Sequence, residues 1–201
     1  MHYLALGDSI SIDEYTGIPG GGAASQFARA VPADTFQDLT GDGWMTQQVQ
    51  KALSRIEGSP NVITLTVGGN DLLALLLQKD EPAILDGRNI LLIISRIQEI
   101  CVHLRKTYDA RLILNTVYDP TDGDAGHLAD AHLPVEVLKM QGELNHGIRL
   151  VARAYGARVS DLEKLFKGHG FWSDDPWLTD IIEPNLAGAT AIARHWQTLL
   201  P

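Results

Sequence analysis

Five short apolar segments alternate along this chain with longer segments whose apolar residues recur at helical spacing. The clearest of the five, residues 62–67, is β-branched and almost continuously apolar, as expected of a strand that is covered on both faces. No hairpin signal joins successive strands. The alternation therefore predicts a parallel sheet with helices on both faces, a three-layer α/β/α architecture. The predicted strands are 2–6, 35–39, 62–67, 111–117 and 157–162.

The segments between these strands have the apolar spacing of amphipathic helices. The last helix is expected to begin at Pro184, because proline suits the first helical turn. A polar link over 79–87, an acidic glycine-rich loop over 121–133 and an irregular loop leading to residue 183 complete the chain. Without repeats or a long linker, residues 1–201 are expected to form a single domain. The other predicted helices are 23–31, 44–56, 72–78, 89–108 and 134–155.

Charge and hydropathy limit the classes of partner. The net charge of −9 argues against nucleic acid or an anionic membrane surface, both of which attract basic patches, and leaves neutral or cationic small molecules. No apolar run reaches the length of a membrane span. Without the pattern of a secretory signal at its start, the protein is expected to be cytoplasmic.

Gly7-Asp8-Ser9 comes directly after the first predicted strand. In an open parallel sheet, ligands bind at the carboxyl ends of the strands, so these residues fall where chemistry is expected. A serine on a sharp turn from strand to helix can expose its hydroxyl as a nucleophile. The alternative is that Asp8 or Ser9 serves only as the N-cap of a helix.

Small polar residues also follow the second and third strands, at Thr40-Gly41 and at 68–71, Gly-Gly-Asn-Asp. Together with Gly7-Asp8-Ser9 and with 180–185, Asp-Ile-Ile-Glu-Pro-Asn, these blocks resemble the SGNH (GDSL-type) hydrolase family of esterases and lipases. Their order extends the resemblance over nearly the whole chain. It implies a flavodoxin-like fold and a serine ester hydrolase (a carboxylesterase, acetylesterase or lipase) that acts on a small-molecule ester without a cofactor.

The resemblance assigns roles to single residues. Ser9 matches the nucleophile, while Gly41 and Asn70 match the donors that, with the N–H of Ser9, form the oxyanion hole. These roles agree with the chemistry, because acyl transfer needs an attacking group and donors aimed at the developing oxyanion. For Asn70, a turn or N-cap role is the alternative. We also expect substrate contacts from residues of the same blocks: Asp8, Gly69 and Asp71.

The last block departs from the family, because Glu183 stands where D-x-x-H-P has its catalytic histidine. Three hypotheses follow. His169, between two glycines of the preceding loop, takes over as base and is oriented by Asp180 or Glu183; this is the preferred hypothesis. Alternatively, Glu183 is itself the base, with its pKa raised by burial. In the third, hydrolysis is lost and the chain is a binding module for acylated or glycan ligands.

The acidic segment 119–132 combines carboxylates with two histidines, side chains that can bind metal ions. Its spacing does not match an EF-hand loop, and His127 and His132 fit no zinc signature. A solvated lid over the site is expected instead, with no metal. The two histidines remain weaker candidates for the base, because they follow the fourth strand at the same edge of the sheet.

Overall fold

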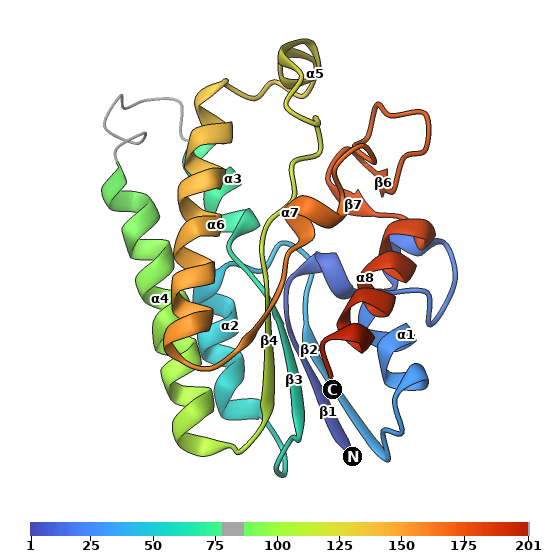
Figure 1. The fold of residues 1–201 in the computed structure, drawn as a ribbon, viewed down its shortest axis with the longest axis vertical. Helices are drawn as coiled ribbons and strands as arrows, with labels where there is room; N and C mark the ends of the chain where they lie inside the picture. The colour runs from blue at the N-terminus through green and yellow to red at the C-terminus, as the bar shows by residue number, and fades with distance from the viewer. Residues whose placement is uncertain (78–86, 201) are drawn as a thin grey trace.

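The computed structural model describes residues 1–77 and 87–200. Its centre is a five-stranded parallel sheet with the order β2-β1-β3-β4-β5 (Figure 1). This is the flavodoxin-like order. The sheet confirms the predicted fold class. The strands are β1 (His2–Gly7), β2 (Thr35–Thr40), β3 (Val62–Thr66), β4 (Arg111–Asn115) and β5 (Arg158–Ser160).

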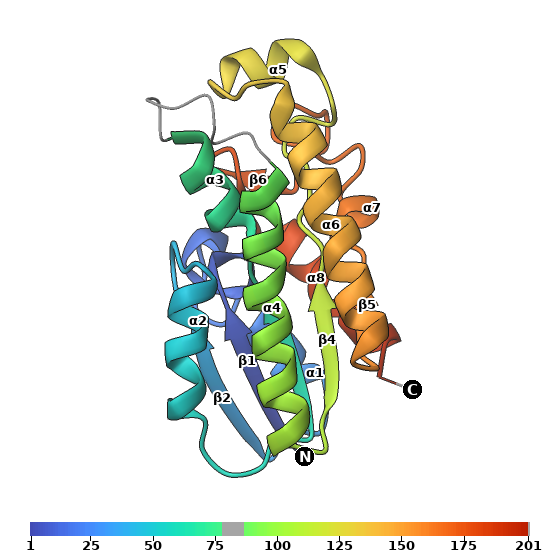
Figure 2. The same ribbon diagram turned by 90° about the vertical axis from the view of Figure 1, so that its left-hand side faces the viewer.

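Helices cover both faces of this sheet, as Figures 1 and 2 show. One face packs against α2 (Thr46–Ala52), α4 (Gly87–Thr107) and α6 (Glu136–Ala154), and the other against α1 (Ala23–Ala30) and α8 (Leu186–Thr198). Another helix, α3 (Gly69–Leu77), follows β3 directly. Within the described ranges, no helix is long and apolar enough to cross a membrane.

The strand β1 supplies both hydrophobic cores. Leu4 and Leu6 belong to the core under α2, α4 and α6, while Tyr3 and Ala5 belong to the core under α1 and α8. Successive strand residues point to opposite faces, so a strand buried on both sides must be apolar at every position. This explains the continuous apolar runs in the sequence.

Register brings the polar blocks to one edge of the sheet. Gly7 pairs with Thr40 of β2 and with Thr66 of β3, so the residues after all three strands lie side by side. Gly7 has a φ of +146°, and a Cβ there would lie 2.0 Å from the carbonyl oxygen of Thr66. Only glycine fits at this turn.

The structure adds elements that the sequence did not reveal. The predicted loop 121–133 contains α5 (Ala125–Asp130), and α7 (Leu162–Leu165) follows β5. The predicted helix 44–56 begins at Thr46 and ends in the short 3₁₀ turn Leu53–Arg55. These segments are one or two turns long, too short for a periodic pattern. Gln78 and residues 79–86 of the predicted link 79–87 lie outside the described residues.

The prediction that the last helix begins at Pro184 is wrong. Pro184 belongs to β7 (Glu183–Pro184), which pairs antiparallel with β6 (Leu178–Thr179). Helix α8 begins after Asn185, whose side chain accepts the N–H groups of Ala187 and Gly188. The reason is that asparagine satisfies the free amides of the first turn, which proline cannot do.

Loss of this cap should destabilise the protein. We expect Asn185→Ala to lower the free energy of unfolding by about 1–2 kcal/mol, because two backbone donors lose their acceptor. Asn185→Asp keeps a capping oxygen and should recover part of the loss. Urea unfolding of the three proteins measures this. Equal stability of Asn185→Ala and the parent would contradict the assigned cap.

Candidate active site

Ser9 begins a 3₁₀ turn, Ser9–Ser11, immediately after β1. Asp8 is the N-cap of this turn, and its carboxylate accepts the N–H of Ile10 at 3.3 Å. The two sequence hypotheses for this block are therefore compatible. Because Asp8 caps the turn, the hydroxyl of Ser9 is left for another partner.

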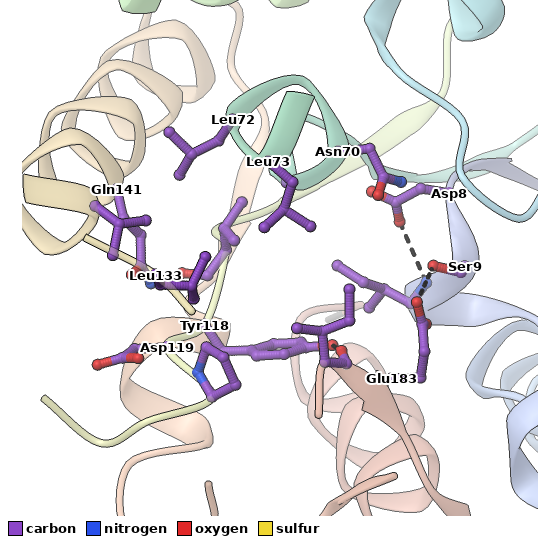
Figure 3. A pocket seen from close by; sticks show the side chains of 16 residues that line it. Asp8, Ser9, Asn70, Leu72, Leu73, Tyr118, Asp119, Leu133, Gln141 and Glu183 are labelled. Carbon is purple, nitrogen blue, oxygen red and sulfur yellow. Dashed lines mark hydrogen bonds between the residues drawn. The ribbon is translucent and has the colours of Figure 1, made fainter. Parts of the chain in front are cut away.

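That partner is Glu183. The hydroxyl of Ser9 donates to Oε1 of Glu183 at 3.0 Å, across 174 residues of sequence (Figure 3). Glu183 is only 7% exposed, and its second oxygen, Oε2, is buried without a hydrogen-bond partner among the described residues. A buried carboxylate with one unsatisfied oxygen is costly and points to a functional site.

Burial raises the pKa of Glu183 to about 7. The hydrogen bond from Ser9 lowers this pKa, while the carboxylates of Asp8, Asp42 and Asp180 raise it. Burial likewise raises the pKa of Asp8 to about 6, against the lowering effect of hydrogen bonds from Thr66 and Ile10. A carboxylate with a pKa near 7 can accept and return a proton at neutral pH.

The strand β7 holds Glu183 in place with help from Tyr118. The Tyr118 hydroxyl donates to the carbonyl oxygen of Ile182, and its ring stacks on Phe166 at 4.3 Å. Burial raises the pKa of Tyr118 well above its usual value, so the hydroxyl stays a donor. The turn before Glu183 places Ile181 at a φ of +68°, an unfavourable conformation for a β-branched residue. Such local strain is typical of functional sites.

The three expected oxyanion donors are not equivalent. The Ser9 N–H lies at the start of a 3₁₀ turn, where backbone donors have no partner within the helix. Asn70 donates one amide hydrogen to the carbonyl oxygen of Trp44 at 3.0 Å and retains a second, and its side chain borders the cavity beside Ser9. The Gly41 N–H donates to the carbonyl oxygen of Gly7 at 3.1 Å and is already occupied.

The structure does not bring His169 to Ser9. Its ring stacks on Trp177 with 3.7 Å between centroids, and Nδ1 lies 3.0 Å from the carbonyl oxygen of Asp175. Asp180 is exposed on the turn between β6 and β7. The two weaker candidates for the base also have other partners. The ring of His127, in α5, stacks on Trp172, and Nδ1 of His132, just after α5, contacts the carbonyl oxygen of Ala129.

The residues expected to contact substrate separate into two groups. Asp8 and Gly69 border the cavity next to Ser9. Asp71 instead accepts the backbone N–H of Thr46 at 2.8 Å and its hydroxyl at 2.6 Å, at the first residue of α2. Arg96 lies 3.9 Å from the same carboxylate. Through these contacts Asp71 joins α3 to α2.

An apolar cavity extends from Ser9 toward α3 and α6, with leucine side chains at the far end in Figure 3. Leu72 and Leu73 of α3 line this cavity, and the sequence did not indicate that α6 contributes to it. The residues after β4 could have been found, because they follow a strand at the binding edge. The lining residues that no expectation covered are Ile10, Val117, Tyr118, Leu133, Val137, Gln141 and Ile182. Among the described residues, no group of three or more His, Cys, Asp or Glu could hold a metal ion.

Comparison with known proteins identifies the family of this chain. A family model described as the GDSL-like lipase/acylhydrolase family matches residues 5–191. The chain belongs to this family. No curated protein matches the chain.

Solved structures agree with this GDSL-like fold. A phospholipase A1 from Streptomyces albidoflavus NA297 superposes with a TM-score of 0.72 at 19% identity, covering 98% of both chains. An extracellular lipase from Streptomyces rimosus gives 0.74 at 17% identity, also covering 98% of both chains. The acetyl xylan esterase AlAXEase gives 0.74 at 17% identity over 100% of each chain. At these identities the likeness establishes the fold.

Burial of Glu183 in this GDSL-like chain should make stability depend on pH. The folded state holds the proton of Glu183 more tightly than the unfolded chain, so stability due to this group is full below about pH 4.5 and is lost as pH rises through about 7. We expect Glu183→Gln, which is neutral at every pH, to be about 1–2 kcal/mol more stable than the parent at about pH 8.5. The gain should shrink at about pH 5.

Urea unfolding at the two pH values measures this difference. Glu57→Gln, which neutralises an exposed glutamate, is the matched control and should show no pH-dependent gain. A gain for Glu183→Gln that is the same at both pH values would contradict the raised pKa.

Proposed function

We propose that the protein is a serine ester hydrolase in which Ser9 is the nucleophile and Glu183 the general base. The observation that carries the proposal is the 3.0 Å hydrogen bond from the Ser9 hydroxyl to Glu183. Membership of the GDSL-like family supports ester hydrolysis as the reaction class.

In the first half of the reaction, Ser9 attacks the ester carbonyl while Glu183 Oε1 takes the hydroxyl proton. The tetrahedral intermediate then carries a negative charge on the former carbonyl oxygen. The Ser9 N–H and the free amide hydrogen of Asn70 stabilise this oxyanion. Gly41 would serve as a third donor only after its N–H leaves the carbonyl oxygen of Gly7.

The intermediate collapses when Glu183 returns the proton to the departing alcohol, leaving an acyl group on Ser9. Water then attacks this acyl-enzyme while Glu183 accepts a proton from the water. Transfer of that proton to Ser9 releases the carboxylic acid. A pKa near 7 allows Glu183 to act as base and as acid in the same cycle.

Glu183 is favoured over His169 because it contacts the nucleophile, whereas the His169 ring is held by Trp177 and Asp175. Asp180 supports the reaction from a distance, since its carboxylate helps to raise the pKa of Glu183. The retained serine–carboxylate contact favours catalysis over a binding module.

Hydrolysis of p-nitrophenyl acetate by three variants tests these roles. We expect Ser9→Ala to abolish turnover and Glu183→Gln to lower kcat/KM by about 100- to 10,000-fold, the usual contribution of a general base. His169→Ala should stay within about three-fold of the parent, because it does not touch Ser9. Loss of activity in His169→Ala with retention in Glu183→Gln would make the histidine the base. Equal rates for the parent and Ser9→Ala would favour the binding module.

The pH profile gives a second test. Because only deprotonated Glu183 can accept a proton, kcat/KM should rise with pH through a midpoint near 7 and then level off. Asp8→Asn keeps a capping side chain but removes a neighbouring charge, so the midpoint should move to lower pH. Asp109→Asn, at the opposite edge of the sheet, is the charge-matched control. A midpoint that Asp8→Asn does not move would contradict the assignment to Glu183.

A further inference from the structure

The surroundings of Ser9 differ sharply on its two sides. Toward α3 and α6, the cavity lining includes the aliphatic side chains of Leu72, Leu73, Leu133 and Val137 (Figure 3). The order β2-β1-β3 places the loop after β2 on the other side of Ser9. With an apolar acyl group in the cavity, the side of Ser9 that faces this loop and the turn between β6 and β7 is left for the alcohol group.

Two exposed carboxylates lie on this alcohol side. Asp42 follows β2 beside the Ser9 turn, since the preceding residue, Gly41, donates its N–H to Gly7 at 3.1 Å. Asp180 lies on the β6–β7 turn that ends at Glu183. The carboxylates of both residues add to the effect of burial in raising the pKa of Glu183. We refer to Asp42 and Asp180 as the acidic rim.

The cavity next to the acidic rim is itself acidic. Among the described residues that line the cavity, Asp8, Asp119 and Glu183 are acidic and none is lysine, arginine or histidine. Glu183 is 7% exposed, and its Oε2 has no hydrogen-bond partner in the described part of the chain. The buried site therefore offers an unsatisfied acceptor and a negative potential to whatever enters it.

We propose, on the basis of the hydrolase function above, that the preferred substrates are esters of a small apolar acid with a cationic alcohol. The acyl group occupies the cavity along α3 and α6, and the positive charge of the alcohol lies between Asp42 and Asp180. Esters whose alcohol carries a carboxylate, sulfonate or phosphate are poor substrates, because the carboxylates of the acidic rim and of the neighbouring cavity repel a negative charge.

Three butyrate esters with the same acyl group separate charge from size. Choline butyrate is cationic, neohexyl butyrate is its uncharged isostere, and sulfopropyl butyrate is anionic. We expect kcat/KM to fall in this order. At about 20 mM salt, kcat/KM for choline butyrate should exceed that for neohexyl butyrate by about five- to ten-fold. The ratio should fall toward about two at about 500 mM salt, because the acidic rim is exposed and screened.

The double variant Asp42→Asn/Asp180→Asn tests the named residues. Asparagine tolerates the positive φ of residue 180, so the turn is retained. The choline-to-neohexyl ratio should drop about three-fold in this variant, whatever happens to the absolute rates. Asp109→Asn, before β4 at the opposite edge, removes a charge remote from the site and should leave the ratio and the activity unchanged.

A binding measurement on the Ser9→Ala protein separates this inference from the proposed function. Choline should shift the backbone amide resonances of residues 42 and 180 in an NMR titration, and neohexanol should not. Choline binding without hydrolysis of any ester would support the acidic rim and overturn the hydrolase. A choline-to-neohexyl ratio near one, or a ratio that the double variant leaves unchanged, would overturn the charge preference while Ser9-dependent hydrolysis stands.

Discussion

The close approach of Gly7 to Thr66 is the constraint on which the site depends. The Asp8 N–H donates to the Thr66 carbonyl oxygen at 3.0 Å, so the chain turns away from the sheet at the first residue after β1. A side chain at Gly7 would collide with that carbonyl. Since β1 lies between β2 and β3, this turn holds Ser9 between the ends of both neighbours. The nucleophile candidate is thus placed by backbone geometry.

A second interaction crosses the whole chain. Glu183 comes from a two-residue strand near the C-terminus, and its carboxylate meets a hydroxyl from the first turn of the N-terminal half. Burial of this carboxylate is unfavourable, as shown by its pKa near 7 and by an Oε2 that has no hydrogen-bond partner among the described residues. Tyr118 and the capped start of α8 hold the hairpin that carries it. Functional sites typically contain groups that lower the stability of the folded protein in this way.

Much of the fold could be predicted from the sequence, because strands buried on both faces leave continuous apolar runs and long helices leave a periodic stripe. Val62–Thr66 and Gly87–Thr107 are such elements. The same reasoning could not find β6, β7, α5 and α7, which are too short for a pattern. It also predicted a helical Pro184, because the helix preference of a single residue carries no information about the pairing of Pro184 with Leu178.

For the site, the sequence by itself determined which polar residues end the strands, and hence that Ser9 and Asn70 share one edge of the sheet. The resemblance to the family also implied that Glu183 stands where the family pattern has a histidine. Only the tertiary structure decided among His169, Asp180 and Glu183 as partners of the serine, because their approach to Ser9 depends on how distant segments pack. It likewise assigned Asp71 to Thr46 and the Gly41 N–H to Gly7, since a hydrogen-bond partner is fixed by folding rather than by spacing.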